Sequence, residues 1–128
     1  MSALGRVEKA QLIVDAALER KAERPVALDM REVSSIADTF VLVTGRSSRQ
    51  VRAVADGILE RLRALGEKPL GVEGMDEGRW VLLDLGDVIV HVFEPEVREH
   101  YDLERLWSDA PPLDLQLGPE ASLQESAR

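Results

Sequence analysis

The sequence predicts an α/β fold in which about five short strands form one mixed sheet flanked by helices. Segments with helical and strand periods follow one another as helix, strand, strand, helix, strand, hairpin and helix. The helical segment after the second strand indicates a crossover connection, which a mixed sheet requires. The chain has 128 residues, 45% of them hydrophobic, which is enough for one compact domain with its own core.

The first half of the chain supplies a helix and two strands. Apolar residues at three- and four-residue steps predict a helix over residues 5–23, which Pro25 would end. Alternating apolar residues predict a strand over 26–30. A polar connection over 34–38 leads to residues 39–43, which are apolar at nearly every position. That pattern indicates a strand covered on both faces.

The most regular helix carries a continuous apolar stripe from Val51 to Leu65. Ser47 and Gln50 before this stripe have the spacing of a capping box, and Gly66 is suited to end the helix. A short strand is expected over residues 69–72.

The clearest hairpin consists of two apolar runs, 80–85 and 88–93, around Gly86 and Asp87. Glycine in the first position suits a two-residue turn. Residues 96–107 after this hairpin are expected to be helical, in two pieces.

The end of the chain has a different composition. Residues 109–128 lack a hydrophobic period and contain Pro-Pro and Gly-Pro pairs, so we expect a disordered acidic tail there. Residues 1–108 are then expected to form the folded domain.

The charge balance favours some partners over others. Twenty-four acidic residues against sixteen basic ones give a net charge of −8. Because nucleic acids bind proteins mainly through lysine and arginine, we expect little direct nucleic acid contact and an attraction to basic proteins. No apolar run is long enough to span a membrane and no signal peptide is recognisable, so a cytoplasmic location is expected. The absence of cysteine excludes disulfides, thiolate metal sites and cysteine nucleophiles.

The hairpin pairing places two different faces on the predicted sheet. One face is purely aliphatic and therefore belongs to the core. The other face places Trp80, Leu82 and Asp84 opposite Phe93, His91 and Ile89. Aromatic residues next to a few polar groups are typical of a protein–protein binding surface. The alternative is that a helix covers this face and that Asp84 binds a backbone amide at its edge.

The loop before Trp80 extends this candidate surface. Residues 73–79 are rich in glycine and charge, and we expect Glu73 and Asp76 to frame the surface. Metal ligation is not expected, because His91 and His100 lack the spacing of paired ligands. No cofactor is expected either, because the loop 44–48 before a helix is better explained by capping than by phosphate binding.

Several segments together resemble the ribosomal silencing factor, or Iojap-like, family over about residues 6–110. The resemblance rests on SSIADTF at 34–40, TGRSSRQV at 44–51, GVEG at 71–74, WVLLDLGDVIVHVF at 80–93, and the spaced Arg98, Tyr101, Leu103, Glu104, Leu106 and Trp107. It implies a nucleotidyltransferase-like fold without enzymatic activity. It also implies a translational repressor that binds the large ribosomal subunit at ribosomal protein L-fourteen, blocks joining of the small subunit and aids large-subunit maturation.

In that family the partner surface involves the tryptophan that matches Trp80, which agrees with the face selected by alternation. We extend the surface to Leu82, Asp84, His91, Glu73 and Asp76. Two other hypotheses stay open. One is a degenerate nucleotidyltransferase that binds a nucleotide at residues 45–48, with Asp84 or Asp87 holding magnesium. The other is a homodimer that pairs through the same face.

Overall fold

The expected mixed sheet of five strands is confirmed. The computed structural model describes residues 5–116. Its strands run in the order β1-β2-β5-β4-β3. β2 and β5 are parallel, and the other neighbouring pairs are antiparallel. The strands are β1 (Glu23–Asp29), β2 (Thr39–Thr44), β3 (Gly71–Glu73), β4 (Trp80–Asp84) and β5 (Val88–Phe93).

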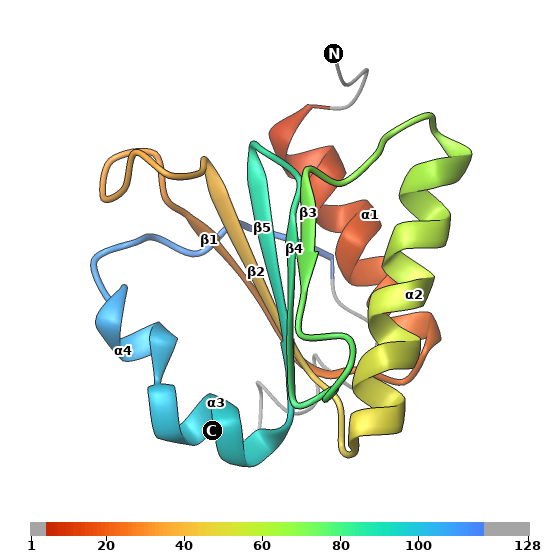
Figure 1. The fold of residues 1–128 in the computed structure, drawn as a ribbon. Coiled ribbons are helices and arrows are strands. Elements are labelled where there is room, and N and C mark those ends of the chain that lie inside the picture. The colour runs from red at the N-terminus through yellow and green to blue at the C-terminus, as the bar shows by residue number, and fades with distance from the viewer. Residues whose placement is uncertain (1–4, 117–128) are drawn as a thin grey trace.

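Helices cover both faces of the sheet. They are α1 (Arg6–Glu19), α2 (Ser48–Ala64), α3 (Pro95–Tyr101) and α4 (Leu103–Leu106). Figure 1 shows α1 and α2 on one side of the sheet and α3 and α4 on the other. The main aliphatic core lies under α1 and α2, and a smaller core lies under α3, α4 and the residues that follow. Within residues 5–116, none of the helices is long and apolar enough to cross a membrane.

The pairing of the β4–β5 hairpin agrees with the sequence prediction. Trp80 lies opposite Phe93, Leu82 opposite His91 and Asp84 opposite Ile89. Gly86 has a φ of 89°, a conformation that favours glycine in a tight turn. Because side chains alternate along each strand, this register places the aliphatic set under α1 and α2 and the mixed set on the opposite face.

The start of the chain differs from the prediction in its boundaries. α1 ends at Glu19, and Lys21, with a φ of 70°, turns the chain out of the helix before Pro25 is reached. β1 already begins at Glu23, and its pairing is irregular between Glu23 and Val26. Proline is tolerated there because an irregular part of an edge strand does not need every N–H.

The N-terminus of α2 forms only half of the expected capping box. The Ser47 hydroxyl accepts a hydrogen bond from the Gln50 amide at 3.1 Å, as predicted. The Gln50 side chain, however, accepts one from the amide of Arg46 at 2.7 Å. At the other end Gly66 has a φ of 79°, which confirms it as the stop of the helix.

Residues 109–116 depart from the disorder expected of the tail. The amide of Asp29 donates to the carbonyl of Pro111 at 2.7 Å, and the amide of Leu113 donates to that of Ala27 at 2.8 Å. Leu113 and Leu115 pack against the main core. The segment thereby provides hydrogen-bond partners for backbone groups of the edge strand β1 that would otherwise lack them. The rest of the predicted tail, residues 117–128, lies outside the described residues.

Candidate partner-binding site

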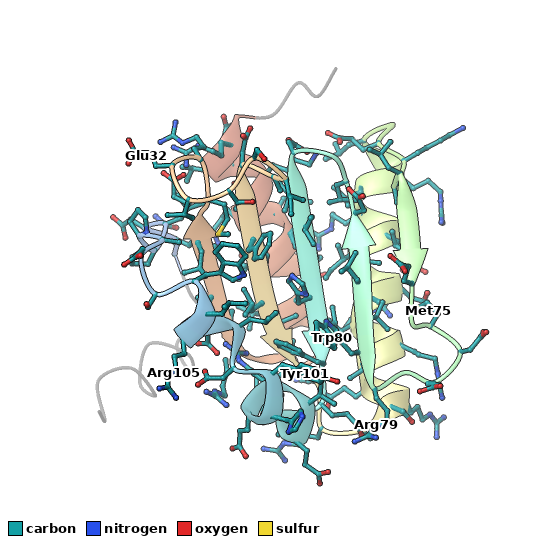
Figure 2. All side chains as sticks on the ribbon, turned by 60° about the vertical axis from the view of Figure 1, so that its left-hand side comes forward. Glu32, Met75, Arg79, Trp80, Tyr101 and Arg105 are labelled. Carbon is teal, nitrogen blue, oxygen red and sulfur yellow. The ribbon has the colours of Figure 1, made fainter. Side chains whose placement is uncertain are left out.

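A groove opens between the β3–β4 loop and α3. It encloses about 910 Å³ and is lined by Val72, Gly74, Met75, Asp76, Glu77, Arg79, Trp80, Glu96, Val97, His100 and Tyr101. Figure 2 looks onto this face of the sheet and shows Trp80 and Tyr101 next to each other, with Met75 and Arg79 nearby. The groove therefore combines an aromatic pair with carboxylates from two sides.

Trp80 is half-buried and held by three ring contacts. Its ring centroid lies 4.8 Å from that of Tyr101 and 5.9 Å from those of Phe93 and His91. The indole Nε1–H donates a hydrogen bond to Nδ1 of His91 at 3.1 Å. No helix of the described chain seals the indole, so its free edge faces the groove.

The β5 side of the predicted surface is covered. Phe93, His91 and Ile89 are all buried and belong to the layer beneath α3 and α4. Burial lowers the pKa of His91 to about 4, because a charged imidazole loses its hydration there. His91 is 5% exposed, so it supports the site from beneath and offers almost no contact area of its own.

The β4 side of the predicted surface is partly open. Leu82 is half-buried and lies opposite Glu73 of β3, which brings these two predicted residues together. Asp84 follows the alternative interpretation, since its carboxylate accepts a hydrogen bond from the Gly86 amide at 2.9 Å and shapes the turn. The β4 side of this face is thus partly open, as a binding surface requires. Its β5 side is covered, as the alternative of a helix over this face requires.

The loop that carries Asp76 is held in place by backbone contacts. The Gly78 amide donates to the Gly74 carbonyl at 2.9 Å, and Arg52 of α2 donates to the carbonyl of Asp76 at 3.2 Å. A Cβ atom at Gly74 would overlap the carbonyl oxygen of Trp80. Glu73 and Asp76 are exposed. Because its backbone is fixed, the loop holds Asp76 at the groove, and Glu73 lies next to it at the end of β3.

Tyr101, Arg79 and Glu96 line the groove but were not among the predicted site residues. Tyr101 is 54% exposed and packs on Trp80. Arg79 forms a hydrogen-bonded ion pair with Glu94 at 3.1 Å and lies 4.0 Å from Glu96. The sequence contained one indication of this: polar residues recur through 94–101, which is typical of a helix with one side facing solvent.

The nucleotide-binding hypothesis finds no support in the arrangement of its residues. Thr44, just before the 45–48 loop, lies beside Phe93, whereas Asp84 and Asp87 lie at the Val88 end of β5. Five residue steps along a strand separate the two ends by roughly 17 Å. Asp87 is also paired with Lys9 at 2.9 Å. Across residues 5–116, no group of three or more His, Asp or Glu side chains is placed to hold a metal ion.

The groove joins a half-buried tryptophan to an exposed tyrosine among acidic side chains, a combination that is typical of protein-binding surfaces. The comparisons with known proteins give the family. The family model described as "Ribosomal silencing factor during starvation" matches residues 5–128, and the chain belongs to this family. The match extends past Pro111, where the resemblance in the sequence had been expected to stop.

Relatives and a solved structure agree with this assignment. The chain is 45% identical to ribosomal silencing factor RsfS of Halalkalibacterium halodurans, over 85% of this chain and 93% of that protein. It is 47% identical to RsfS of Bacillus subtilis, over 78% of this chain and 85% of that protein. A crystal structure of a Chromobacterium violaceum protein matches with a TM-score of 0.80 and 37% identity, over 82% of this chain and 88% of that one. A mouse relative, 32% identical over 56% of this chain and 32% of its own length, is named "Mitochondrial assembly of ribosomal large subunit protein 1".

Proposed function

We propose that this protein is a translational repressor that binds the large ribosomal subunit through ribosomal protein L-fourteen. In this proposal the bound domain blocks joining of the small subunit by its bulk and also aids maturation of the large subunit. The names of its relatives support a role in silencing and in assembly of the large subunit. The mechanism requires binding and no chemical step.

The half-buried Trp80 at the groove is the observation on which the proposal depends. Interface hot spots are enriched in tryptophan, tyrosine and arginine that fill well-packed positions surrounded by weaker contacts. Trp80 and Tyr101 lie together in the groove, and Leu82 continues the open strip along β4. A specific interface buries roughly 1,200–2,000 Å² in total, so we expect the partner to contact the strip and the acidic loop as well as the groove.

The charges around the groove favour a basic partner. Glu73, Asp76, Glu77 and Glu96 are exposed there, in a chain of net charge −8. Complementary charge speeds association and selects against acidic partners. A basic ribosomal protein fits this surface better than exposed phosphate does, which agrees with the expectation of little direct nucleic acid contact.

Truncation of Trp80 tests the proposal. We expect Trp80→Ala to weaken binding to purified large subunits by about 2 kcal/mol or more, as hot-spot truncations do, while the domain stays folded. The measurement is co-sedimentation with large subunits, with and without small subunits. Ile36→Ala is the matched control, because Ile36 is an apolar side chain with 68% exposure in the loop at the opposite end of the sheet. Wild-type binding by a folded Trp80→Ala variant would contradict the proposed site.

The same open face is the surface through which a homodimer of the free chain would form. A second copy would then compete with the ribosomal partner for Trp80. Sedimentation equilibrium of the wild type and of Trp80→Ala tests this possibility. If the wild type is a dimer and Trp80→Ala is a monomer, the dimer forms through the groove. If the wild type is a dimer and the variant stays one, the chains associate through another surface.

A further inference from the structure

His91 has a structural role that packing alone does not explain. It is buried among apolar neighbours on the covered side of the site. Its Nε2 atom is buried and has no hydrogen-bond partner among residues 5–116. An incompletely satisfied polar group in an apolar layer costs stability, and an aliphatic side chain of similar size would avoid that cost. Among the described side chains, the one hydrogen-bond partner of the imidazole is the Trp80 indole.

We propose that His91 is a positioning residue that fixes the orientation of the Trp80 indole for the partner. This inference rests on the proposed function, because it assigns a role to a second residue of the same site. His91 acts through Trp80 and makes no contact with the partner itself.

The geometry explains why a hydrogen bond is needed for this role. His91 lies opposite Leu82, so it is the diagonal neighbour of Trp80 across the β4–β5 pair, within reach of a long aromatic side chain. Tyr101 and Phe93 pack on the indole. Ring contacts alone, however, are compatible with both preferred values of the χ2 torsion, which differ in the direction of the N–H edge. The bond from Nε1 selects the direction in which the N–H edge points inward. The opposite edge of the indole is then presented to the groove.

The hydrogen bond also fixes the state of the imidazole. The indole N–H is only a donor, so Nδ1 must be unprotonated and the proton of the neutral ring lies on Nε2. Burial in an apolar layer keeps the ring neutral. His91 is therefore a permanent acceptor at neutral pH, and Trp80 is organised before its partner arrives. Such preorganisation lowers the entropy that binding must remove.

Two substitutions at His91 separate positioning from packing. His91→Leu replaces the imidazole by a buried apolar side chain of similar bulk and so removes the hydrogen-bond acceptor. His91→Asn places an oxygen close to the position of Nδ1 and restores an acceptor. The first measurement is hydrogen exchange of the Trp80 indole N–H by NMR, with the signal assigned through Trp107→Phe. The second is co-sedimentation with large subunits, and thermal unfolding reports on the fold.

In the Leu variant we expect faster indole exchange and binding about three- to tenfold weaker, without a loss of thermal stability. The Asn variant should recover slow exchange and most of the binding. His91→Met serves as a second apolar variant should the Leu variant fail to fold. The proposal is overturned if the apolar variant keeps wild-type exchange or wild-type binding, or if the Asn variant behaves like it. Failure of the proposed function would appear in a different experiment, as wild-type binding of large subunits by Trp80→Ala. The exchange experiment needs no ribosome and therefore tests the role of His91 independently.

Discussion

The ammonium group of Lys9 on α1 lies 2.9 Å from the carboxylate of Asp87 in the turn between β4 and β5. It also lies 2.8 Å from Glu67, just beyond α2, and only 2% of the Lys9 side chain is exposed. Burial alone would lower the pKa of Lys9, but the hydrogen bonds and charges of Glu67 and Asp87 outweigh burial and raise it. The hairpin that carries Trp80 is thus tied to both helices of the opposite layer.

Removal of both carboxylates should destabilise the protein strongly. In Glu67→Gln/Asp87→Asn the Lys9 ammonium stays buried without a counter-charge, and we expect the free energy of unfolding to fall by about 3 kcal/mol or more. Denaturant unfolding measures this change. Lys9→Met is the matched control and should cost less, because the Asp87 carboxylate, with 43% exposure, still reaches water. An equal or greater loss in Lys9→Met would show that the buried charge does not determine the stability.

Gly74 offers a test of the acidic loop. Gly74 has a φ of 89°, and a Cβ there would overlap the Trp80 carbonyl, so Gly74→Ala should displace the loop or β4. We expect subunit binding to fall about tenfold or more, since hot-spot positions tolerate little displacement. Gly66→Ala is the control, because Gly66 has a φ of 79° but its Cβ would meet no described atom within 4 Å. It should cost about 1 kcal/mol of stability and leave binding unchanged. Similar binding by the two variants would contradict the assigned role of the loop.

The sequence determines the β4–β5 hairpin almost completely. Its turn residues fix the register, and the register decides that Val81 and Leu83 face the core while Trp80 and Leu82 face the other side. What covers that other side depends on long-range packing. The chain turns at Asp102, with a φ of 46°, between α3 and α4, and this turn directs Trp107 back onto Phe40. Local periodicity predicts the two helices but not where they dock.

The same limit applies to the candidate site. Trp80, Leu82 and Glu73 come together because strand pairing places them side by side. The burial of His91 and the contribution of Tyr101 follow from the way α3 and α4 dock on the sheet. The alternation of residues along the strands does not predict this docking. Alternation therefore predicts which residues share a face, whereas tertiary packing decides which of them stay open.

Neutralising the acidic side chains in and beside the groove should slow association with the basic partner. For Glu73→Gln/Asp76→Asn we expect binding to weaken about twofold to fivefold at low salt, and less at high salt, because exposed charges are screened. The measurement is the affinity for large subunits at two ionic strengths. Glu32→Gln/Asp56→Asn removes two exposed acids that lie between β1 and β2 and on α2, outside the candidate surface, and controls for net charge. An equal loss in both variants would assign the effect to total charge.

The buried imidazole predicts how stability depends on pH. His91 has a pKa of about 4 in the folded chain, lowered by burial, against an ordinary value of 6.5. Because the unfolded chain binds the proton first, His91 should lower the free energy of unfolding as pH falls from 6.5 towards 4, by about 2 kcal/mol between pH 7 and pH 5. The positions beside it on β4 and β2 are Leu82 and Leu42, which carry no charge. Carboxylates also titrate in acid, so the measurement is the difference between the wild type and His91→Leu across this range. The wild type should lose stability relative to the variant as pH falls, since the variant lacks this proton uptake, and parallel curves would contradict a neutral, buried His91.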